Sequence, residues 1–180
     1  MQARDIPNLI TVFRIVLVAP VSWAILEQQY MLALVLFFVA GVSDGLDGFL
    51  AKRYDWSSRL GALLDPLADK ALLIACYASL SWAGLLPMWL FALIILRDVV
   101  IVAGAVAYHF WIARLEAEPT LISKLNTLFQ ILLVLLVIIG EATGWHRDGW
   151  IDYLVYAVTV TTVWSGSDYV ITWSRRARQA

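Results

Sequence analysis

Four aspartates, Asp44, Asp47, Asp65 and Asp69, stand in or beside apolar stretches of the chain. A carboxylate in hydrocarbon costs on the order of a few kcal/mol, so an acid at membrane depth is a functional-site candidate by default. The spacings of three and four residues place both members of each pair on one face of a helix. The four aspartates therefore predict a site that holds cations.

The two pairs fall on neighbouring apolar segments that are joined by a short polar turn. We expect these segments to be antiparallel helices that bring both pairs together at one end. Ligation by carboxylate oxygens suits Mg²⁺ or Mn²⁺. Four carboxylates exceed the need of one such ion, so we predict two ions, a pairing typical of phosphoryl chemistry. The alternative is that these are helix-end residues in water or structural ion pairs, which is our interpretation of Asp55.

Composition predicts an all-α polytopic membrane protein that forms a single domain over residues 1–180. The chain is 62% hydrophobic and 15% charged, against about 25% charged in soluble domains, and its mean hydropathy is +0.78. No basic face with interleaved aromatic residues is present, which argues against a nucleic-acid partner. The single cysteine, Cys76, excludes an intrachain disulfide, and the first residues do not have the pattern of a signal peptide.

Six apolar stretches have about the length that a membrane-spanning helix needs. They cover roughly residues 9–25, 31–50, 60–82, 88–110, 121–139 and 151–173. Six spans place both termini on one side, and most basic residues fall on that side, whereas only Arg147 falls on the other. This bias predicts that both termini are cytoplasmic. The basic residues on the predicted cytoplasmic side are Arg4, Lys52, Arg53, Arg59, Arg114, Arg175, Arg176 and Arg178.

The spacing of the aspartates resembles the signature of the CDP-alcohol phosphatidyltransferases. The pattern here is Asp44-x2-Asp47-Gly48-x2-Ala51-Lys52-x8-Gly61-x3-Asp65-x3-Asp69. The resemblance extends to Ile6-Pro7-Asn8 through Arg14 and to the six-span layout, so it covers essentially the whole chain. One position departs from the pattern, because the family usually has Arg where this chain has Lys52. Lysine can meet a phosphate as a point charge but lacks the bidentate geometry of arginine.

The resemblance implies transfer of a phosphatidyl group from a CDP-linked lipid to an alcohol, with release of CMP. It implies that Asp44, Asp47 and Asp65 hold two metal ions, and that Asp69 is both a ligand and the catalytic general base. Asn8 and Thr11 are expected to cap a helix and contact the ligand, or to cap alone. The full set expected at the CDP-lipid site is Asn8, Thr11, Gly48, Ala51, Lys52, Ser58 and Gly61.

Three basic residues within the spans are candidates for binding an anionic acceptor: Arg97, Lys124 and Arg14. Each has a simpler alternative. Arg97 could pair with Asp98 or with the four carboxylates. Lys124 could snorkel to the membrane interface. For Arg14, as for Lys124, both acceptor binding and this simpler alternative are open.

Residues 6–8, 64–70, 97–100 and above all 119–127 resemble the cardiolipin synthase branch of the family. That branch joins CDP-diacylglycerol to phosphatidylglycerol, so we expect this reaction. The alternative acceptor is glycerol 3-phosphate, as in phosphatidylglycerophosphate synthase. A cation transporter and a non-catalytic scaffold are alternatives of other classes, but the acids gather on one side and no internal repeat is visible. Analogy with the family further predicts a homodimer, and the start of the chain favours a bacterial cytoplasmic membrane.

Overall fold

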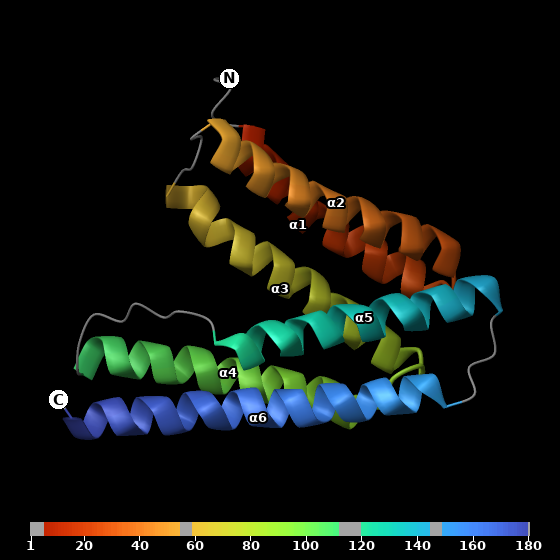
Figure 1. Ribbon diagram of the computed structural model, residues 1–180. Coiled ribbons are helices and arrows are strands. Elements are labelled where there is room, and N and C mark those ends of the chain that lie inside the picture. Colours follow the sequence, from red (N-terminus) through yellow and green to blue (C-terminus); the bar gives the residue numbers. More distant parts are fainter. Residues whose placement is uncertain (1–5, 55–58, 112–119, 145–148, 180) are drawn as a thin grey trace. The chain divides into compact units, whose positions relative to one another are not determined.

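The computed structural model describes residues 6–54, 59–111, 120–144 and 149–179, with side chains described outside 6–7, 48–52, 59–63, 107–111 and 173–179. The regular secondary structure of the described residues is entirely helical, as predicted (Figure 1). They are α1 (Ile6–Leu26), α2 (Tyr30–Tyr54), α3 (Arg59–Trp82), α4 (Met88–Trp111), α5 (Leu121–Thr143) and α6 (Trp150–Gln179).

Four of these helices contain a stretch that is long and apolar enough to cross a membrane: Asn8–Leu26, Tyr30–Asp47, Met88–Val106 and Leu121–Thr143. Helices α3 and α6 fall outside this group when the described residues are searched. The sequence gives the reason, since α3 carries Asp65, Asp69 and Lys70 close together and α6 is rich in Thr and Ser. That all six helices cross the membrane stays a prediction.

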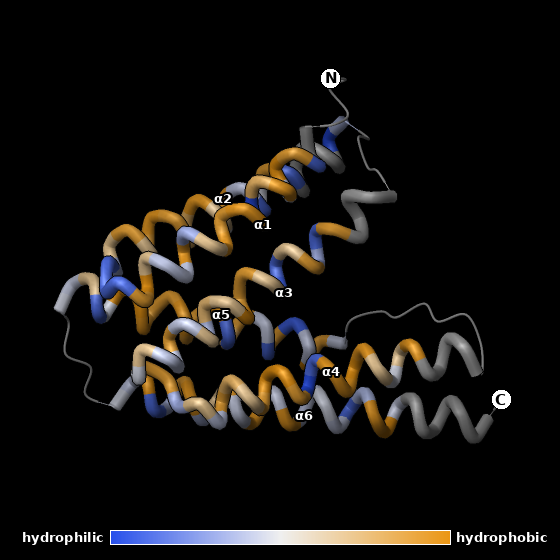
Figure 2. The backbone as a smooth tube through the Cα atoms, turned by 180° about the vertical axis from the view of Figure 1, so that it is seen from behind, coloured by the Kyte–Doolittle hydropathy of each residue, from blue (hydrophilic) through white to orange (hydrophobic). Residues whose placement is uncertain are grey.

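Large apolar side chains point outward along the helices, which is the arrangement typical of a membrane protein. Val16 is 61% exposed, Phe38 67% and Val163 51%. Figure 2 shows hydrophobic residues along much of α1, α2 and α4. Water-soluble monomers rarely expose apolar surface this continuously. Hydrocarbon would cover these side chains without cost, because lipid tails are as apolar as they are.

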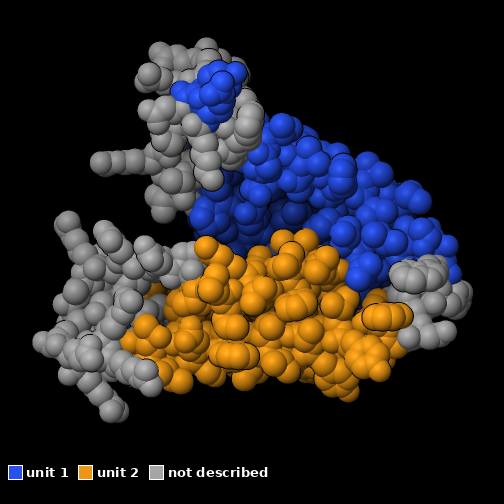
Figure 3. Space-filling view, viewed as in Figure 1, with its two compact units in different colours: residues 1–86, 134–146 blue, residues 87–133, 147–180 orange. Residues whose placement is uncertain are grey.

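The chain divides into two compact units (Figure 3). Unit 1 comprises residues 1–86 and 134–146, and unit 2 comprises residues 87–133 and 147–180. In unit 1, the extensive helix contacts of the described residues are those of α1 with α2 and of α1 with α3. We expected α2 and α3 to be antiparallel neighbours across their short turn; α1 is the helix that has extensive contacts with both. In unit 2, α4 packs on α6.

The face of α1 that packs on its neighbours is a single stripe of buried residues. Leu17, Val21 and Ala24 are buried at steps of four and three residues, the spacing of one helical face. Extending the stripe backward by three residues at a time reaches Arg14 and Thr11, which are also buried. The register that packs the apolar part of α1 therefore also places these two polar side chains inside unit 1.

The buried face of α2 follows the same logic. Ala33, Phe37 and Ala40 are buried, and the two alanines allow close approach of α1, as small residues do at helix contacts within membranes. Seven residues after Ala40, nearly two full turns, the same face presents Asp47, which is buried as well. The packing register of α2 therefore brings a carboxylate to the α1 face that holds Arg14.

Candidate functional site

Arg14 of α1 lies among three of the four aspartates. Its Nη1 is 2.9 Å from Asp44 Oδ1 and 2.5 Å from Asp69 Oδ1, and its Nη2 is 2.6 Å from Asp47 Oδ2. The side chain of Arg14 is 1% exposed. One guanidinium therefore connects α2 and α3, and the predicted convergence of the two pairs of acids is confirmed in unit 1.

Thr11, one turn before Arg14, brings in the fourth aspartate. Its hydroxyl donates a hydrogen bond of 2.5 Å to Asp65 Oδ1 and lies 3.4 Å from Asp47 Oδ2. Both partners are carboxylates, and hydrogen bonds to ionised acceptors are the stronger class. We call Asp44, Asp47, Asp65 and Asp69 the carboxylate cluster; α1 supplies it with one cation and one hydroxyl.

The carboxylate cluster is buried on one side and open on the other. The side chain of Asp47 is 4% exposed, whereas those of Asp44 and Asp69 are 49% and 48% exposed. Arg14 contributes one positive charge to a cluster of four carboxylates, so this residue alone leaves an excess of formal negative charge. A cationic ligand could approach it past Asp44 and Asp69.

The residues fit a divalent-cation site in their chemistry and their convergence. Oxygen-only carboxylate ligands are what Mg²⁺ and Mn²⁺ take, and they gather around one side chain. As the described side chains stand, however, no group of three acids is arranged to hold a metal ion. The Arg14 guanidinium contacts three of the four carboxylates itself, which accounts for that arrangement.

For several residues predicted at the CDP-lipid site, the structure does not describe the side chain. Ser58 is outside the described residues. The backbone of the other four lies in α2 or α3, but their side chains are outside the described set: Gly48, Ala51, Lys52 and Gly61. Asn8 is half-buried near the start of α1. Thr11 is the member of that predicted set whose contacts can be traced, and they are with carboxylates.

Arg97 of α4 forms a second polar cluster, within unit 2. Its Nη1 donates to Asp98 Oδ1 at 2.8 Å, and its Nη2 donates to Ser123 Oγ at 2.8 Å and to Ser165 Oγ at 2.5 Å. Its guanidinium carbon lies 5.9 Å from the centre of the Tyr169 ring. Arg97 therefore links α4, α5 and α6, and of its two predicted alternatives the pair with Asp98 is present.

The contacts of this arginine with residues of α5 and α6 were not predicted from the sequence. Gly166 packs beside Arg97, and a Cβ at this position would lie in van der Waals contact with Arg97 Cγ, at 3.4 Å. One turn along both helices, Asn126 Oδ1 accepts hydrogen bonds from Thr161 at 2.9 Å and Thr162 at 2.8 Å. Polar residues repeating every three or four positions within apolar helices were the available signal. Lys124, in contrast, is exposed.

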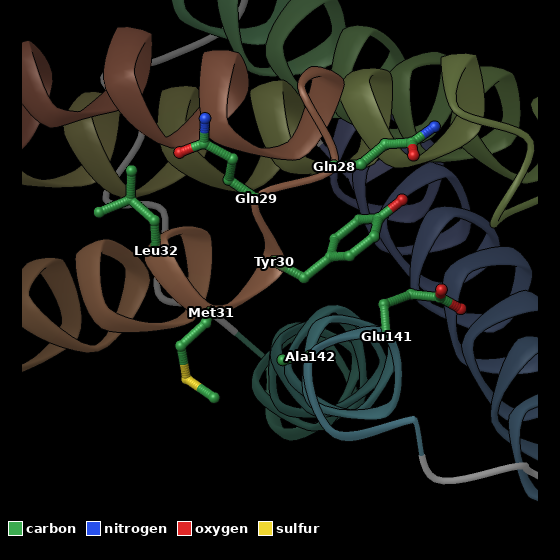
Figure 4. A pocket seen from close by; sticks show the side chains of 7 residues that line it. All are labelled: Gln28, Gln29, Tyr30, Met31, Leu32, Glu141 and Ala142. Carbon is green, nitrogen blue, oxygen red and sulfur yellow. The ribbon is translucent and has the colours of Figure 1, made fainter.

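A cavity of about 410 Å³ lies elsewhere in unit 1, at the turn between α1 and α2 (Figure 4). Along α2, 14 residues separate Tyr30 at this cavity from Asp44, or about 21 Å at 1.5 Å per residue. The cavity is therefore separate from the carboxylate cluster. It is lined by Gln28, Gln29, Tyr30, Met31, Leu32, Glu141 and Ala142.

Residues 4–164 match the model of one protein family, described as CDP-alcohol phosphatidyltransferase. The matched region includes the carboxylate cluster and Arg97. The chain belongs to the CDP-alcohol phosphatidyltransferase family. The resemblance predicted from the spacing of the aspartates is thereby confirmed, and the family argues for an enzyme over a transporter or a scaffold.

Curated relatives of this chain carry two different names. The cardiolipin synthase (CMP-forming) of Rattus norvegicus is 35% identical, over 91% of this chain and 60% of its own length. The CDP-diacylglycerol–glycerol-3-phosphate 3-phosphatidyltransferase of Escherichia coli K12 is 31% identical, over 92% of this chain and 93% of its own. A chloroplastic protein of that second name from Oryza sativa is 32% identical, over 93% and 56%. The chain thus spans 60% of the length of the cardiolipin synthases of Rattus norvegicus and Homo sapiens.

Proposed function

We propose that this protein transfers a phosphatidyl group from CDP-diacylglycerol to the hydroxyl group of an acceptor and releases CMP. The observation that carries the proposal is the convergence of Asp44, Asp47, Asp65 and Asp69 around Arg14 and Thr11. The donor carries a diphosphate, and binding it beside carboxylates requires cations. In a member of this family, an acid-rich site at the ends of apolar helices fits a lipid-linked nucleotide.

The reaction is a displacement at the phosphorus that carries the diacylglycerol. The acceptor oxygen forms a bond to this phosphorus, the bond from phosphorus to the CMP oxygen breaks, and the hydroxyl proton passes to a base. We assign the base to Asp69, whose half-exposed carboxylate can be reached from outside the cluster. Asp44, Asp47 and Asp65 would hold two Mg²⁺ or Mn²⁺ ions with Asp69. Such ions supply neutralisation of the diphosphate and of the leaving group.

We propose phosphatidylglycerol as the acceptor, giving cardiolipin. The resemblance of residues 119–127 to the cardiolipin synthase branch supports this choice, as do relatives of that name. Glycerol 3-phosphate is the second candidate, because relatives named for it match nearly as well. Either acceptor is anionic, and Arg97, Lys124 and Arg14 remain our candidates for binding it.

Membrane placement follows from the same reasoning. We propose that all six helices cross the bilayer of a bacterial cytoplasmic membrane, with both termini and the carboxylate cluster at the cytoplasmic face. The apolar outward surfaces support placement in a membrane, and the bias of Arg and Lys between loops supports the orientation. A homodimer is proposed by analogy with the family.

The test is to incubate the purified protein in lipid with CDP-diacylglycerol, Mg²⁺ or Mn²⁺, and one acceptor at a time. We expect CMP and cardiolipin with phosphatidylglycerol, and loss of both products when EDTA removes the metal. If product formed only with glycerol 3-phosphate, this compound and not phosphatidylglycerol would be the acceptor. Absence of CMP release with every acceptor, by a folded protein, would contradict the transferase proposal.

A further inference from the structure

The Arg14 guanidinium fills the place where cations bound by the carboxylate cluster would have to sit. Two carboxylate oxygens, one from Asp44 and one from Asp69, lie within 3 Å of the same nitrogen, Nη1. Mg²⁺ takes carboxylate oxygens at about 2.0–2.1 Å and demands near-octahedral geometry. A guanidinium and a divalent cation cannot both occupy the space between these oxygens.

Arg14 is also incompletely satisfied where it lies. Among the described residues, its buried Nε has no hydrogen-bond partner, although a buried N–H normally has one. Its two Nη atoms account for all of its contacts with Asp44, Asp47 and Asp69. A side chain that is buried, charged and left with an unused donor can gain a partner by moving. The half-exposed Asp44 and Asp69 give a cation a way in from outside.

We infer that Arg14 and divalent cations compete for the same carboxylates. Without the metal, Arg14 is the counter-ion that holds α2 and α3 against α1. When the metal binds, the guanidinium leaves the carboxylates and offers its donors to the phosphates of the nucleotide lipid. The inference rests on the proposed function, since it takes the carboxylate cluster as the cation site. It gives Arg14 a positioning role toward the metal, in addition to the acceptor role considered above.

Competition has a measurable consequence. When a site is open to its ligand for only a fraction of the time, the apparent affinity equals the intrinsic affinity multiplied by that fraction. If Arg14 holds the carboxylates nine-tenths of the time or more, its removal should strengthen metal binding by about tenfold or more. Linkage is reciprocal, so metal should also weaken the hold of Arg14 on the cluster. If Arg14 had only a structural role, its removal should weaken metal binding, because the carboxylates would be held less firmly.

The experiment is a titration of the full chain in detergent with Mn²⁺ and no lipid substrate, reading free Mn²⁺ by electron paramagnetic resonance. Arg14→Gln should bind Mn²⁺ about tenfold more tightly than the unaltered protein, and its thermal unfolding in EDTA should occur at a lower temperature. The matched control is Arg53→Gln, which removes the same charge from an exposed position on α2. The control should leave Mn²⁺ affinity within about twofold.

A second measurement follows the unaltered protein directly. With ¹⁵N-labelled arginine in the unaltered protein, the Nε resonance of Arg14 should shift on addition of Mg²⁺, whereas that of Arg53 should stay in place. The assignment can be made with Arg14→Lys. Equal or weaker Mn²⁺ binding by Arg14→Gln, or an Arg14 resonance that Mg²⁺ does not move, overturns the inference. Because neither readout uses turnover, CMP release measured in parallel separates failure of this inference from failure of the proposed transferase activity.

Discussion

Replacing Thr11 by valine tests how the fourth aspartate is held. Valine has the shape and the β-branching of threonine, so the packing of α1 is preserved. What is lost is the hydroxyl, which donates to Asp65 at 2.5 Å and lies 3.4 Å from Asp47. Thr11 is 1% exposed, so the methyl group that replaces the hydroxyl offers no donor to either carboxylate.

The magnitude follows from the charge and exposure of the partners. A hydrogen bond to a charged group contributes roughly 1.5–3 kcal/mol. Asp65 is only half-buried, and water can replace part of the lost bond, so the lower half of this range applies. We expect Thr11→Val to lower the free energy of unfolding by about 1.5–2 kcal/mol. For a chain of this size that corresponds to about 3–8 °C in the unfolding temperature.

The assay is the loss of helical circular dichroism on heating in detergent, with EDTA present so that no metal contributes. Thr11→Ser keeps the hydroxyl and should recover most of the stability. Thr127→Val is the matched control, because Thr127 is exposed and its hydroxyl donates to the backbone carbonyl of Ser123 rather than to a carboxylate. The control should change the unfolding temperature little.

Two results would refute the reasoning. One is a Thr11→Val protein that unfolds at the temperature of the unaltered chain, which would mean that the hydroxyl contributes nothing to the cluster. The other is an equal loss in Thr11→Ser and Thr11→Val, which would attribute the effect to packing. Either outcome would remove Thr11 from the account of how Asp65 is positioned.

Three further predictions address catalysis, the second arginine and a turn. Asp69→Asn keeps the volume of the side chain but removes the proposed base, and it should lower the rate of CMP release by about 10²–10⁴-fold while Mn²⁺ binding is still detectable. Arg97→Lys cannot reach Asp98, Ser123 and Ser165 together; it should cost about 1–3 kcal/mol in thermal unfolding and, if Arg97 binds the acceptor, raise the acceptor KM more than it lowers kcat. Gln28 has φ of 59°, a conformation that costs L-residues about 1–2 kcal/mol, so Gln28→Gly should raise the free energy of unfolding by about 0.5–1 kcal/mol after the entropy cost of glycine.

Sequence reasoning located the elements and the acids because both depend on simple periodicities. A membrane-spanning helix is an apolar stretch of fixed length, so the predicted ranges differ from the observed helices by only a few residues at most ends. The carboxylate cluster was found from spacings of three and four residues, which put Asp44 with Asp47 and Asp65 with Asp69 on common faces. Convergence of the two pairs was predicted correctly.

The sequence did not identify which helix brings the pairs together. A short turn between α2 and α3 indicates neighbours, but it does not exclude a third helix from packing on both. Packing in a membrane depends on small residues and polar contacts at the interface between helices. Such contacts can be recognised in a sequence only when it is known which two helix faces meet. For the same reason the contacts of Arg97 with Ser123 and Ser165 were missed. Each serine by itself looks like a tolerated polar residue in an apolar helix.

The role of α1 explains why the signature residues alone do not define the site. Asp44, Asp47, Asp65 and Asp69 repel one another, and two helices that carried only these acids would be driven apart where they should meet. Two residues of α1, which lies outside the Asp44–Asp69 segment, reduce that repulsion. Arg14 supplies a positive charge and Thr11 supplies a hydrogen-bond donor. Arg14 offsets one of these four negative charges and by itself leaves a deficit of positive charge. In the proposed function, that deficit would favour the binding of metal ions and then of a nucleotide diphosphate, so the proposed chemistry would use the same charge imbalance that α1 partly offsets.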